Sequence, residues 1–497
     1  ATRGRLTRQL LAESAVLVAI GSAGGLLVAD WGARALAAFA PEGLLAGYRV
    51  GVDGRVLAAT LAIAVAATVA FALAPVLQWN IRALPAALRD EGRGASTGRG
   101  RQRSRRAMVV SQIALALVLA SGAGLLVRSF VNALRVEPGF EPAHLLSFQV
   151  ALPAHRYPDG ASVARTEREL VDALASVPGV TRASAASYLP TTTYWQVAVT
   201  PEGVELPKTP LVINDIAHPG YFETMGIRLV QGRTFDERDV PGSPPAVIVD
   251  EQFAKKYFPG GDAVGRRLKW GSAESPDPWY TVVGVVRSVK AKSLDEQSAP
   301  QTYFAAPQQA AQPPLVDFAL RRMHYVVRTT GDPLAMASTV RRIVRTVDPE
   351  LPVTHVATGE SLVAQSLTGR RFDMLLLSAF AALALVLAAV GLYGLIAYSV
   401  VQRQREIGIR MAIGATPRGV VQLVLREGAW TAGIGALLGI AGAVALTRVM
   451  SSLLFGVGAL DAEAFVAATA LLVAVALLAS WLPARRAARV DPVDALR

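Results

Sequence analysis

The sequence of 497 residues contains no cysteine, which excludes a disulfide framework and any metal site built from thiolates. It also lacks the G-x-x-x-x-G-K-[ST] phosphate loop, the G-x-S-x-G nucleophile turn and the H-E-x-x-H zinc motif. Five histidines are scattered singly, which favours strand or loop positions over metal ligands: His144, His155, His218, His324 and His355. These absences argue against ATP hydrolysis by this chain itself and against zinc chemistry.

Charged residues are scarce as well, at 18% of the chain against 52% hydrophobic residues. The mean hydropathy is +0.37, too apolar for an ordinary soluble protein. Six apolar runs approach the roughly 20 residues that a helix needs to cross a bilayer: 10–29, which Glu13 interrupts, 56–80, 107–127, 374–401, 428–447 and 464–483. We therefore expect a bundle of six transmembrane helices.

The arginines predict how these helices are oriented, since arginines near short loops stay on the cytoplasmic side. They cluster at the N-terminus, at 82–106, at 403–418 and at 485–497, whereas the loops 40–53 and 451–461 hold only Arg49 and no lysine. Both termini are thus expected inside and residues of about 128–373 outside. The net charge of +12 lies mainly in these clusters, which favours anionic lipids over nucleic acid as the partner.

An imperfect internal repeat relates the start of the chain to its last two spans. Matching positions include Glu13, Gly21, Gly25, Asp53 and Pro75 in the first copy, and Glu427, Gly435, Gly439, Asp461 and Pro483 in the second. Each glycine pair has the four-residue spacing that allows close helix packing in lipid, and each glutamate is interpreted as snorkelling beside a neighbouring arginine. The first copy covers only the end of the repeat, so we expect the C-terminal part of a longer, duplicated protein; the alternative is a naturally shortened one.

The outer segment alternates strands and helices. A strand at 145–152, an amphipathic helix with Val163, Leu170 and Leu174 on its apolar face, and a strand at 182–188 form one unit. A second unit consists of a strand at 325–329, a helix from Asp332-Pro333 to Asp348-Pro349 and a strand at 353–356. The pattern predicts an α/β (α+β) domain in which a split β-α-β subdomain carries an inserted, strand-rich subdomain at about 195–322. Glu167 and Glu169 are expected on the solvated side of the first helix.

Several segments resemble one family of membrane proteins. Residues 405–415, REIGIRMAIGA, look like the cytoplasmic coupling motif of the MacB/FtsX-like permeases, the class of macrolide exporters and lipoprotein-release permeases. Similar matches are GAGLLVRSF at 122–130 with PGF at 138–140, YFETMG at 221–226 with GR at 232–233, FPG at 258–260 with GR at 265–266, VGVV at 283–286, PARR at 483–486 and DPVDAL at 491–496. The duplication further resembles the orphan permeases of acidobacteria.

The resemblance implies a permease of the bacterial inner membrane that is driven by mechanotransmission. A separate cytoplasmic ABC ATPase would bind ATP and Mg, this chain would hold no cofactor, and the outer domain would move to export an antibiotic, peptide, lipid or lipoprotein. Further implied partners are a periplasmic adaptor, an outer-membrane duct, and a second permease half in a same-chain pseudo-dimer or a homodimer. The alternatives are a non-transporting mechanical regulator or sensor of a periplasmic partner and, more remotely, a membrane-anchored periplasmic enzyme.

The resemblance assigns contact with the ATPase to residues 402–418. The named positions are Arg403, Arg405, Glu406, Ile407, Gly408, Ile409, Arg410, Ile413, Gly414 and Ala415. Charged residues would contact the partner, isoleucines would serve as apolar anchors, and glycines would allow close approach. The alternative is a membrane-exit segment whose arginines contact lipid phosphates.

The expected division of the chain follows from the spans, the repeat and the resemblance together. Five parts are expected: two helices of a first copy at 1–80, a basic cytoplasmic linker at 81–106, a helix at 107–133, a MacB-like periplasmic core domain at 134–373, and an FtsX-like domain with three helices at 374–497.

Overall fold

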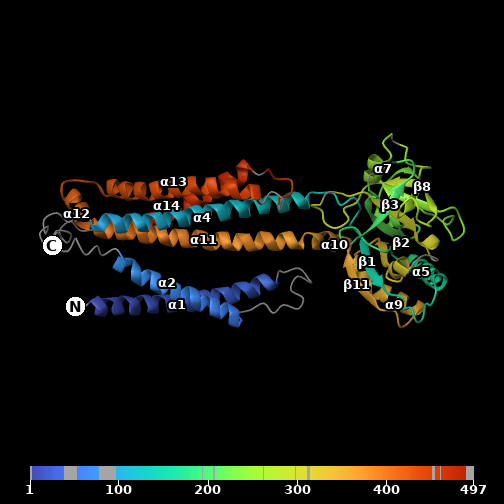
Figure 1. Cartoon of the computed structure of the whole chain (residues 1–497), viewed down its shortest axis with the longest axis horizontal. Coiled ribbons are helices and arrows are strands. Elements are labelled where there is room, and N and C mark those ends of the chain that lie inside the picture. Colours follow the sequence, from blue (N-terminus) through green and yellow to red (C-terminus); the bar gives the residue numbers. More distant parts are fainter. Residues whose placement is uncertain are drawn as a thin grey trace. The chain divides into compact units, whose positions relative to one another are not determined.

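The computed structural model describes residues 3–38, 53–77, 97–192, 194–204, 208–260, 262–296, 298–309, 314–449, 454–458 and 460–488. They fall into two compact units, of which one combines Ala1–Asn132 with Gly369–Arg497 and the other is Ala133–Thr368 (Figure 1). Most of the basic linker at 81–106 and the ending at 491–496 lie outside the described residues. We call the two units the helical unit and the outer unit.

The helical unit consists of long helices. They are α1 (Arg3–Ala38), α2 (Gly54–Leu77), α4 (Thr97–Leu134), α11 (Thr368–Gln402), α13 (Pro417–Val449) and α14 (Ala462–Ala487), with the short α12 (Gln404–Ala412) after α11. All of the long helices except α2 are long and apolar enough to cross a membrane, whereas α2 contributes a shorter apolar stretch, Gly54–Ala66. Five of the six expected spans are therefore found among the described residues.

Four of these helices share one apolar core. Leu117 of α4, Leu392 of α11, Ala432 of α13 and Leu472 of α14 are all buried in it. Their opposite faces expose leucine, valine and phenylalanine, as helices surrounded by lipid do. Helices α1 and α2 pack against each other (Figure 1).

The first layer of the outer unit is a four-stranded antiparallel sheet. Its strands are β1 (Leu145–Val150), β2 (Val180–Ala186), β10 (His324–Thr329) and β11 (Val353–Thr358), in the order β11-β1-β10-β2. Helices α5 (Gly160–Ala175) and α9 (Ala337–Val347) pack against each other and against these strands. The helix expected from Asp332 begins as a 3-10 turn (Pro333–Met336), and the Asp332 side chain caps this turn by accepting a hydrogen bond from the Leu334 amide.

The remaining strands close into a ring. They are β3 (Trp195–Pro201), β4 (Leu211–Ala217), β6 (Ala246–Asp250), β7 (Arg267–Trp270), β8 (Trp279–Val286) and β9 (Gln301–Ala305), while β5 (Leu229–Gly232) pairs with β8 from outside. The pairing runs β4-β3-β7-β8-β6-β9 and returns from β9 to β4. Ala186 of β2 pairs with Ala217 of β4, so the ring and the first layer form one continuous sheet.

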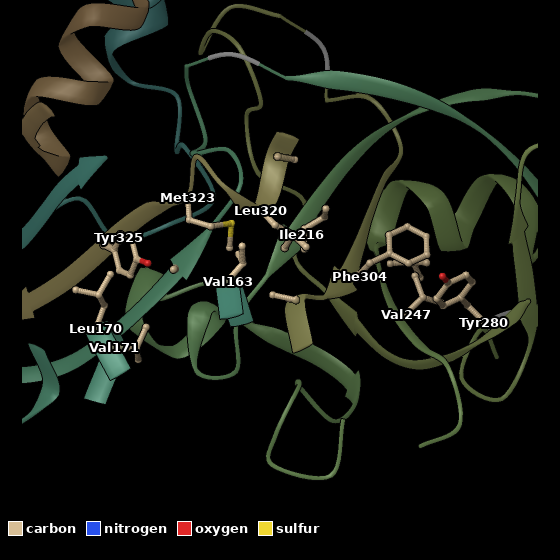
Figure 2. Close-up of a cluster of buried hydrophobic side chains, with 14 of the residues drawn as sticks. Val163, Leu170, Val171, Ile216, Val247, Tyr280, Phe304, Leu320, Met323 and Tyr325 are labelled. Carbon is tan, nitrogen blue, oxygen red and sulfur yellow. The ribbon is translucent and has the colours of Figure 1, made fainter. Parts of the chain in front are cut away.

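One apolar core cluster extends through both parts of the outer unit (Figure 2), and a second cluster, which includes Phe140, Phe222 and Val326, also lies within this unit. Leu170 of α5 and Tyr325 of β10 lie at one end of the first cluster, and Tyr280 and Phe304 lie inside the ring. The rings of Tyr280 and Phe304 are 4.7 Å apart at their centroids, in an edge-to-face contact. Residues 133–368 consequently form one compact unit.

The short helices of the outer unit are α6 (Tyr221–Met225), α7 (Glu251–Tyr257), α8 (Pro314–Leu320) and α10 (Gly359–Ser366), with a 3-10 turn at Ala306–Gln309.

One sequence expectation about α5 is wrong. Glu169 is exposed as predicted, but Glu167 is only 2% exposed. Position 167 lies four residues after Val163 and three before Leu170, and these spacings place it on the buried face of the helix. Its Oε1 has no hydrogen-bond partner, and burial raises the pKa of this carboxyl well above its usual range.

Candidate functional site

The predicted coupling residues lie on and around α12, which has a sharply defined end. Ile413 is the C-cap, and Gly414 has a left-handed backbone with φ of 104°. The Gly414 amide donates to the Met411 carbonyl at 3.0 Å, and the Ala415 amide donates to the Arg410 carbonyl at 2.9 Å. This is the Schellman arrangement that stops a helix. It reverses the chain within a few residues, before α13 begins at Pro417.

One face of α12 is buried against the neighbouring long helices. Ile407 is 4% exposed and packs in the same core cluster as Ile396 of α11 and Val424 of α13. Gly408 beside it is also buried. Ile407 is expected from the sequence to be an apolar anchor for a partner. In the structure its side chain is buried against α11 and α13 and attaches α12 to the helical unit.

The other side chains of α12 that the structure describes include exposed ones, and the charged pair lies at the edge of the buried face. Ile409 is 41% and Ile413 is 82% exposed, and Glu406 and Arg410 form an ion pair of 2.6 Å with both side chains about half exposed. A pair of this kind stabilises a helix by only about 0.2–0.5 kcal/mol. An exposed isoleucine beside two charged groups is therefore available for a protein contact.

A polar contact fixes the junction between α11 and α12. The Arg403 guanidinium lies 3.4 Å from the Glu427 carboxylate of α13, and the Ser399 hydroxyl donates to the same oxygen at 3.3 Å. The sequence predicts that the Glu427 carboxylate snorkels beside Arg426. In the structure this carboxylate pairs with Arg403 instead. Arg405 belongs to α12, and its side chain lies outside the described set.

The predicted packing glycines differ between the two copies of the repeat. A Cβ at Gly435 would lie 2.5 Å from Cγ2 of Ile113, and one at Gly439 would lie 2.9 Å from the Ala114 carbonyl oxygen. Helices α13 and α4 therefore approach each other closely at these positions. No described atom lies within 4 Å of such a Cβ at Gly21 or Gly25.

Gly414 was also expected to allow close approach. No described neighbour lies within 4 Å of a Cβ placed there. A glycine is needed at this position because the helix ends there with a positive φ, which residues with a side chain rarely adopt.

Sequence reasoning missed a second set of contacts, around the segment 137–144 that leads from α4 to β1. We call this segment the strap. Its backbone exchanges hydrogen bonds with separate parts of the outer unit: the Lys290 amide donates to the Pro138 carbonyl at 2.9 Å, and the Glu141 amide donates to the Met225 carbonyl at 2.9 Å. The Pro-Gly-Phe motif at 138–140 was the only sequence signal for it.

Arg328 of β10 holds the strap from one side. Its guanidinium donates to the carbonyls of Ala143 at 2.8 Å and Glu141 at 2.9 Å, and also to Thr224 of α6 at 2.8 Å. On another side, a Cβ at Gly359 would lie 2.2 Å from the Pro142 carbonyl oxygen. The strap is thus fixed in a narrow space.

The segment that leads from the outer unit to α11, which contains α10, is also held by hydrogen bonds. Thr358 caps α10 by accepting a hydrogen bond from the Ser361 amide at 3.1 Å. At the other end of α10, the Ser293 hydroxyl donates to the Ser366 carbonyl at 3.0 Å. Both connections between the outer unit and the long helices α4 and α11 are therefore firmly held inside the outer unit.

Two protein-family models match this chain, one over most of the outer unit and one over the C-terminal helices. A model of the MacB-like periplasmic core domain matches residues 111–365, just over half of the chain. The model of the FtsX-like permease C-terminal domain matches residues 378–492. The chain belongs to the MacB/FtsX-like permease family. For this FtsX-like permease, the helices of membrane-spanning length indicate a multi-pass protein of the inner membrane.

Curated relatives of this FtsX-like permease are export proteins with a longer chain. "Macrolide export ATP-binding/permease protein MacB" of Neisseria meningitidis is 25% identical over 295 residues, which cover 56% of this chain and 42% of the relative. "Pyoverdine export ATP-binding/permease protein PvdT" of Pseudomonas aeruginosa is 27% identical over 282 residues, covering 55% and 40%. The permease thus spans about two fifths of the length of these relatives.

Among solved structures, the periplasmic region of MacB from Actinobacillus actinomycetemcomitans is similar to this FtsX-like permease. It is 13% identical, with a TM-score of 0.32, and the match covers 46% of this chain and 95% of that one. The extracellular domain of the transporter YknZ from Gram-positive bacteria matches at 15% identity and a TM-score of 0.28, covering 42% of this chain and 100% of that one.

Proposed function

We propose that this chain is the permease subunit of an ABC transporter that works by mechanotransmission. ATP hydrolysis by a separate cytoplasmic ATPase would move α12, and the movement would change the conformation of the outer unit. The observation that carries the proposal is the division of α12 into two faces. Ile407 anchors the helix to α11 and α13, while Ile409 and Ile413 are exposed and the half-exposed Glu406–Arg410 pair lies beside Ile407 at the edge of that contact.

The helices next to α12 suit the transmission of a push. Helix α11 has 35 residues without proline and would extend roughly 50 Å at about 1.5 Å per residue. Because Arg403 is paired with Glu427, a displacement of α12 would reach both α11 and α13. Movement of α11 would act on α10, and movement of α4 would act on the strap.

The cargo and the other partners are part of the same proposal. The names of the relatives refer to macrolide and pyoverdine export, and we extend this to export of an antibiotic, peptide, lipid or lipoprotein. ATP and Mg would be bound by the partner ATPase. A periplasmic adaptor with an outer-membrane duct and a second permease half complete the assembly. Both termini would be cytoplasmic, with residues of about 128–373 in the periplasm.

Charge reversal on α12 tests the proposal. The full-length chain would be purified from its own membranes with the ABC ATPase that accompanies it, and ATP hydrolysis by the complex would be measured. We expect Glu406→Arg or Arg410→Glu to weaken the association by roughly tenfold or more, because each reversal places like charges against the partner. The double variant Glu406→Arg/Arg410→Glu keeps an ion pair within the helix, so it separates helix stability from partner contact and should remain defective.

Glu296→Arg is the matched control, since Glu296 forms an exposed pair with Lys292 at the same four-residue spacing in the outer unit. It should leave the complex intact. If the three α12 variants retained both the ATPase and its full activity, α12 would not be the coupling element.

A further inference from the structure

A small pocket opens where the first layer of the outer unit meets the ring. Its walls come from the loop after β2, from β4, from α6 and from β9, including Tyr188, Tyr194, Asp215, Tyr221 and Tyr303. The pocket has about 20 Å³ of free space, and one water-sized group needs at least about 10–15 Å³. It is thus large enough for one small polar group and too small for a whole drug-sized molecule.

Asp215 is the charged group of this pocket, and only one of its oxygens is used. Oδ1 accepts hydrogen bonds from the Ser187 hydroxyl at 2.7 Å, the Tyr188 amide at 3.0 Å and the Ile216 amide at 2.8 Å. Within the described part of the chain, Oδ2 accepts none. The carboxyl is 8% exposed, and burial raises its pKa to about 7 although these donors act in the opposite direction.

No basic side chain balances this carboxylate. The pocket lining contains no lysine, arginine or histidine, and no ion pair joins Asp215 to any residue that the structure describes. The titratable groups that face it are the phenols of Tyr188, Tyr221 and Tyr303. A buried carboxylate without a counter-ion is costly, so a cation that entered here would gain a strong partner.

The tyrosines provide the rest of a cation site. Tyr221 is fully buried, and its hydroxyl has no hydrogen-bond partner. The Tyr303 hydroxyl donates to Gln301 at 2.7 Å, whereas the Tyr221 hydroxyl makes no hydrogen bond among the described residues and can accept one. Aromatic faces attract cations, and Tyr188 and Tyr194 contribute two further rings to the wall.

We propose that this pocket binds the primary ammonium group of an unbranched alkylamine, with Asp215 Oδ2 as its counter-ion and the Tyr221 hydroxyl as a second acceptor. The ammonium group is water-sized and matches the free space, and its alkyl chain would leave through the mouth beside Tyr188 and Tyr194. A lysine side chain of another protein and a free alkylamine present the same group. The residues that line the site all belong to the outer unit, so its occupancy does not depend on the coupling proposed above.

Calorimetric titration of the full-length chain in detergent with n-butylammonium tests the site. We expect saturable binding that is roughly fourfold tighter at about pH 8 than at about pH 6.5, which is the ratio of the ionised fractions of a carboxyl with a pKa of about 7. Binding at the lower pH should release a proton, which buffers of different protonation enthalpy detect. Neutral n-butanol and the bulkier tetramethylammonium should not bind.

Two conservative variants assign the contacts. Asp215→Asn keeps Oδ1 for its three donors but removes the charge, and we expect at least a tenfold loss of affinity. Tyr221→Phe removes only an unpartnered hydroxyl and should weaken binding several-fold without unfolding the chain. Asp262→Asn makes the same carboxyl-to-amide change at an exposed position and should bind as the wild type does.

The remaining outcomes are equally informative. Stronger binding of Nα-acetyl-lysine methylamide than of butylammonium would identify a protein side chain as the natural occupant, and the reverse order would identify a free amine. Unchanged binding by Asp215→Asn, equal binding of butanol, or no saturable binding by the wild type would refute the site. In each of these cases the pocket would hold water only.

Discussion

At the scale of single residues, Glu167 shows that side-chain chemistry and helix position give opposite predictions. Its charge predicts a solvated side chain, whereas its spacing from Val163 and Leu170 predicts burial. The structure follows the spacing, because the helix cannot turn one residue outward without exposing the others on that face. The apolar face of α5 could be predicted from the sequence, but not that a carboxyl lies within it.

Glu167 should make the stability of the chain depend on pH. Burial raises its pKa in the folded state above that in the unfolded state, so its contribution is most favourable below the unfolded pKa and is lost as the pH rises towards the folded pKa. We expect Glu167→Gln to abolish this loss and to increase the free energy of unfolding at about pH 8 by about 1–3 kcal/mol. Thermal unfolding of both chains from pH 5 to 8 in detergent measures the difference.

The exposed Glu169 provides the control, and Glu169→Gln should follow the wild type at every pH. A wild-type chain whose stability rose with pH relative to Glu167→Gln would contradict the assignment.

At the scale of elements, local pattern predicted the long helices and the strands and helices of the first layer, but not the individual strands of the ring. Strands expected at 145–152 and 325–329 are found as β1 and β10, and the expected helices are found as α5 and α9. The ring was not predicted, because its closure depends on the parallel pairing of Ile213 with Gln301. No periodicity within either strand specifies that partner. The segment proposed for coupling was predicted from sequence and stays a prediction, whereas the inward direction of Ile407 needed the structure.

Helix packing in the helical unit gives a prediction at this scale. Gly435→Ala would place a methyl group 2.5 Å from Ile113, so α13 and α4 would have to separate. We expect a cost of about 1–3 kcal/mol, typical of an overfilled core, seen as a lower unfolding temperature in detergent. Gly433→Ala lies on the exposed face of the same helix, with no described atom within 4 Å of its Cβ.

This control should therefore be neutral or slightly stabilising, since alanine favours helix more than glycine does. Equal effects of the two substitutions would mean that α13 and α4 do not pack at Gly435.

At the scale of the whole molecule, the absence of cysteine makes the proposed orientation directly testable. A single cysteine at Asp262→Cys in the outer unit or at Gln404→Cys in α12 would be the one thiol within these 497 residues, and both positions are exposed. We expect a membrane-impermeant maleimide to label Asp262→Cys in intact spheroplasts. Gln404→Cys should react only after permeabilisation, because arginine-rich loops remain inside.

The unsubstituted chain should show no labelling in either preparation. The opposite pattern, with Gln404→Cys labelled first, would place α12 outside and remove it from reach of a cytoplasmic ATPase.

The position of β1 in its sheet has a consequence for biosynthesis. β1 lies between β10 and β11, and Leu145 pairs with Arg328 across most of the outer unit. Because a ribosome makes the chain from its N-terminus, β1 has neither neighbour until residues 324–358 have been translated. Contacts between such distant segments form slowly. A chain that stalls before residue 324 would therefore present two open strand edges to proteases and chaperones, and an incomplete copy would be recognised before it could join a transporter.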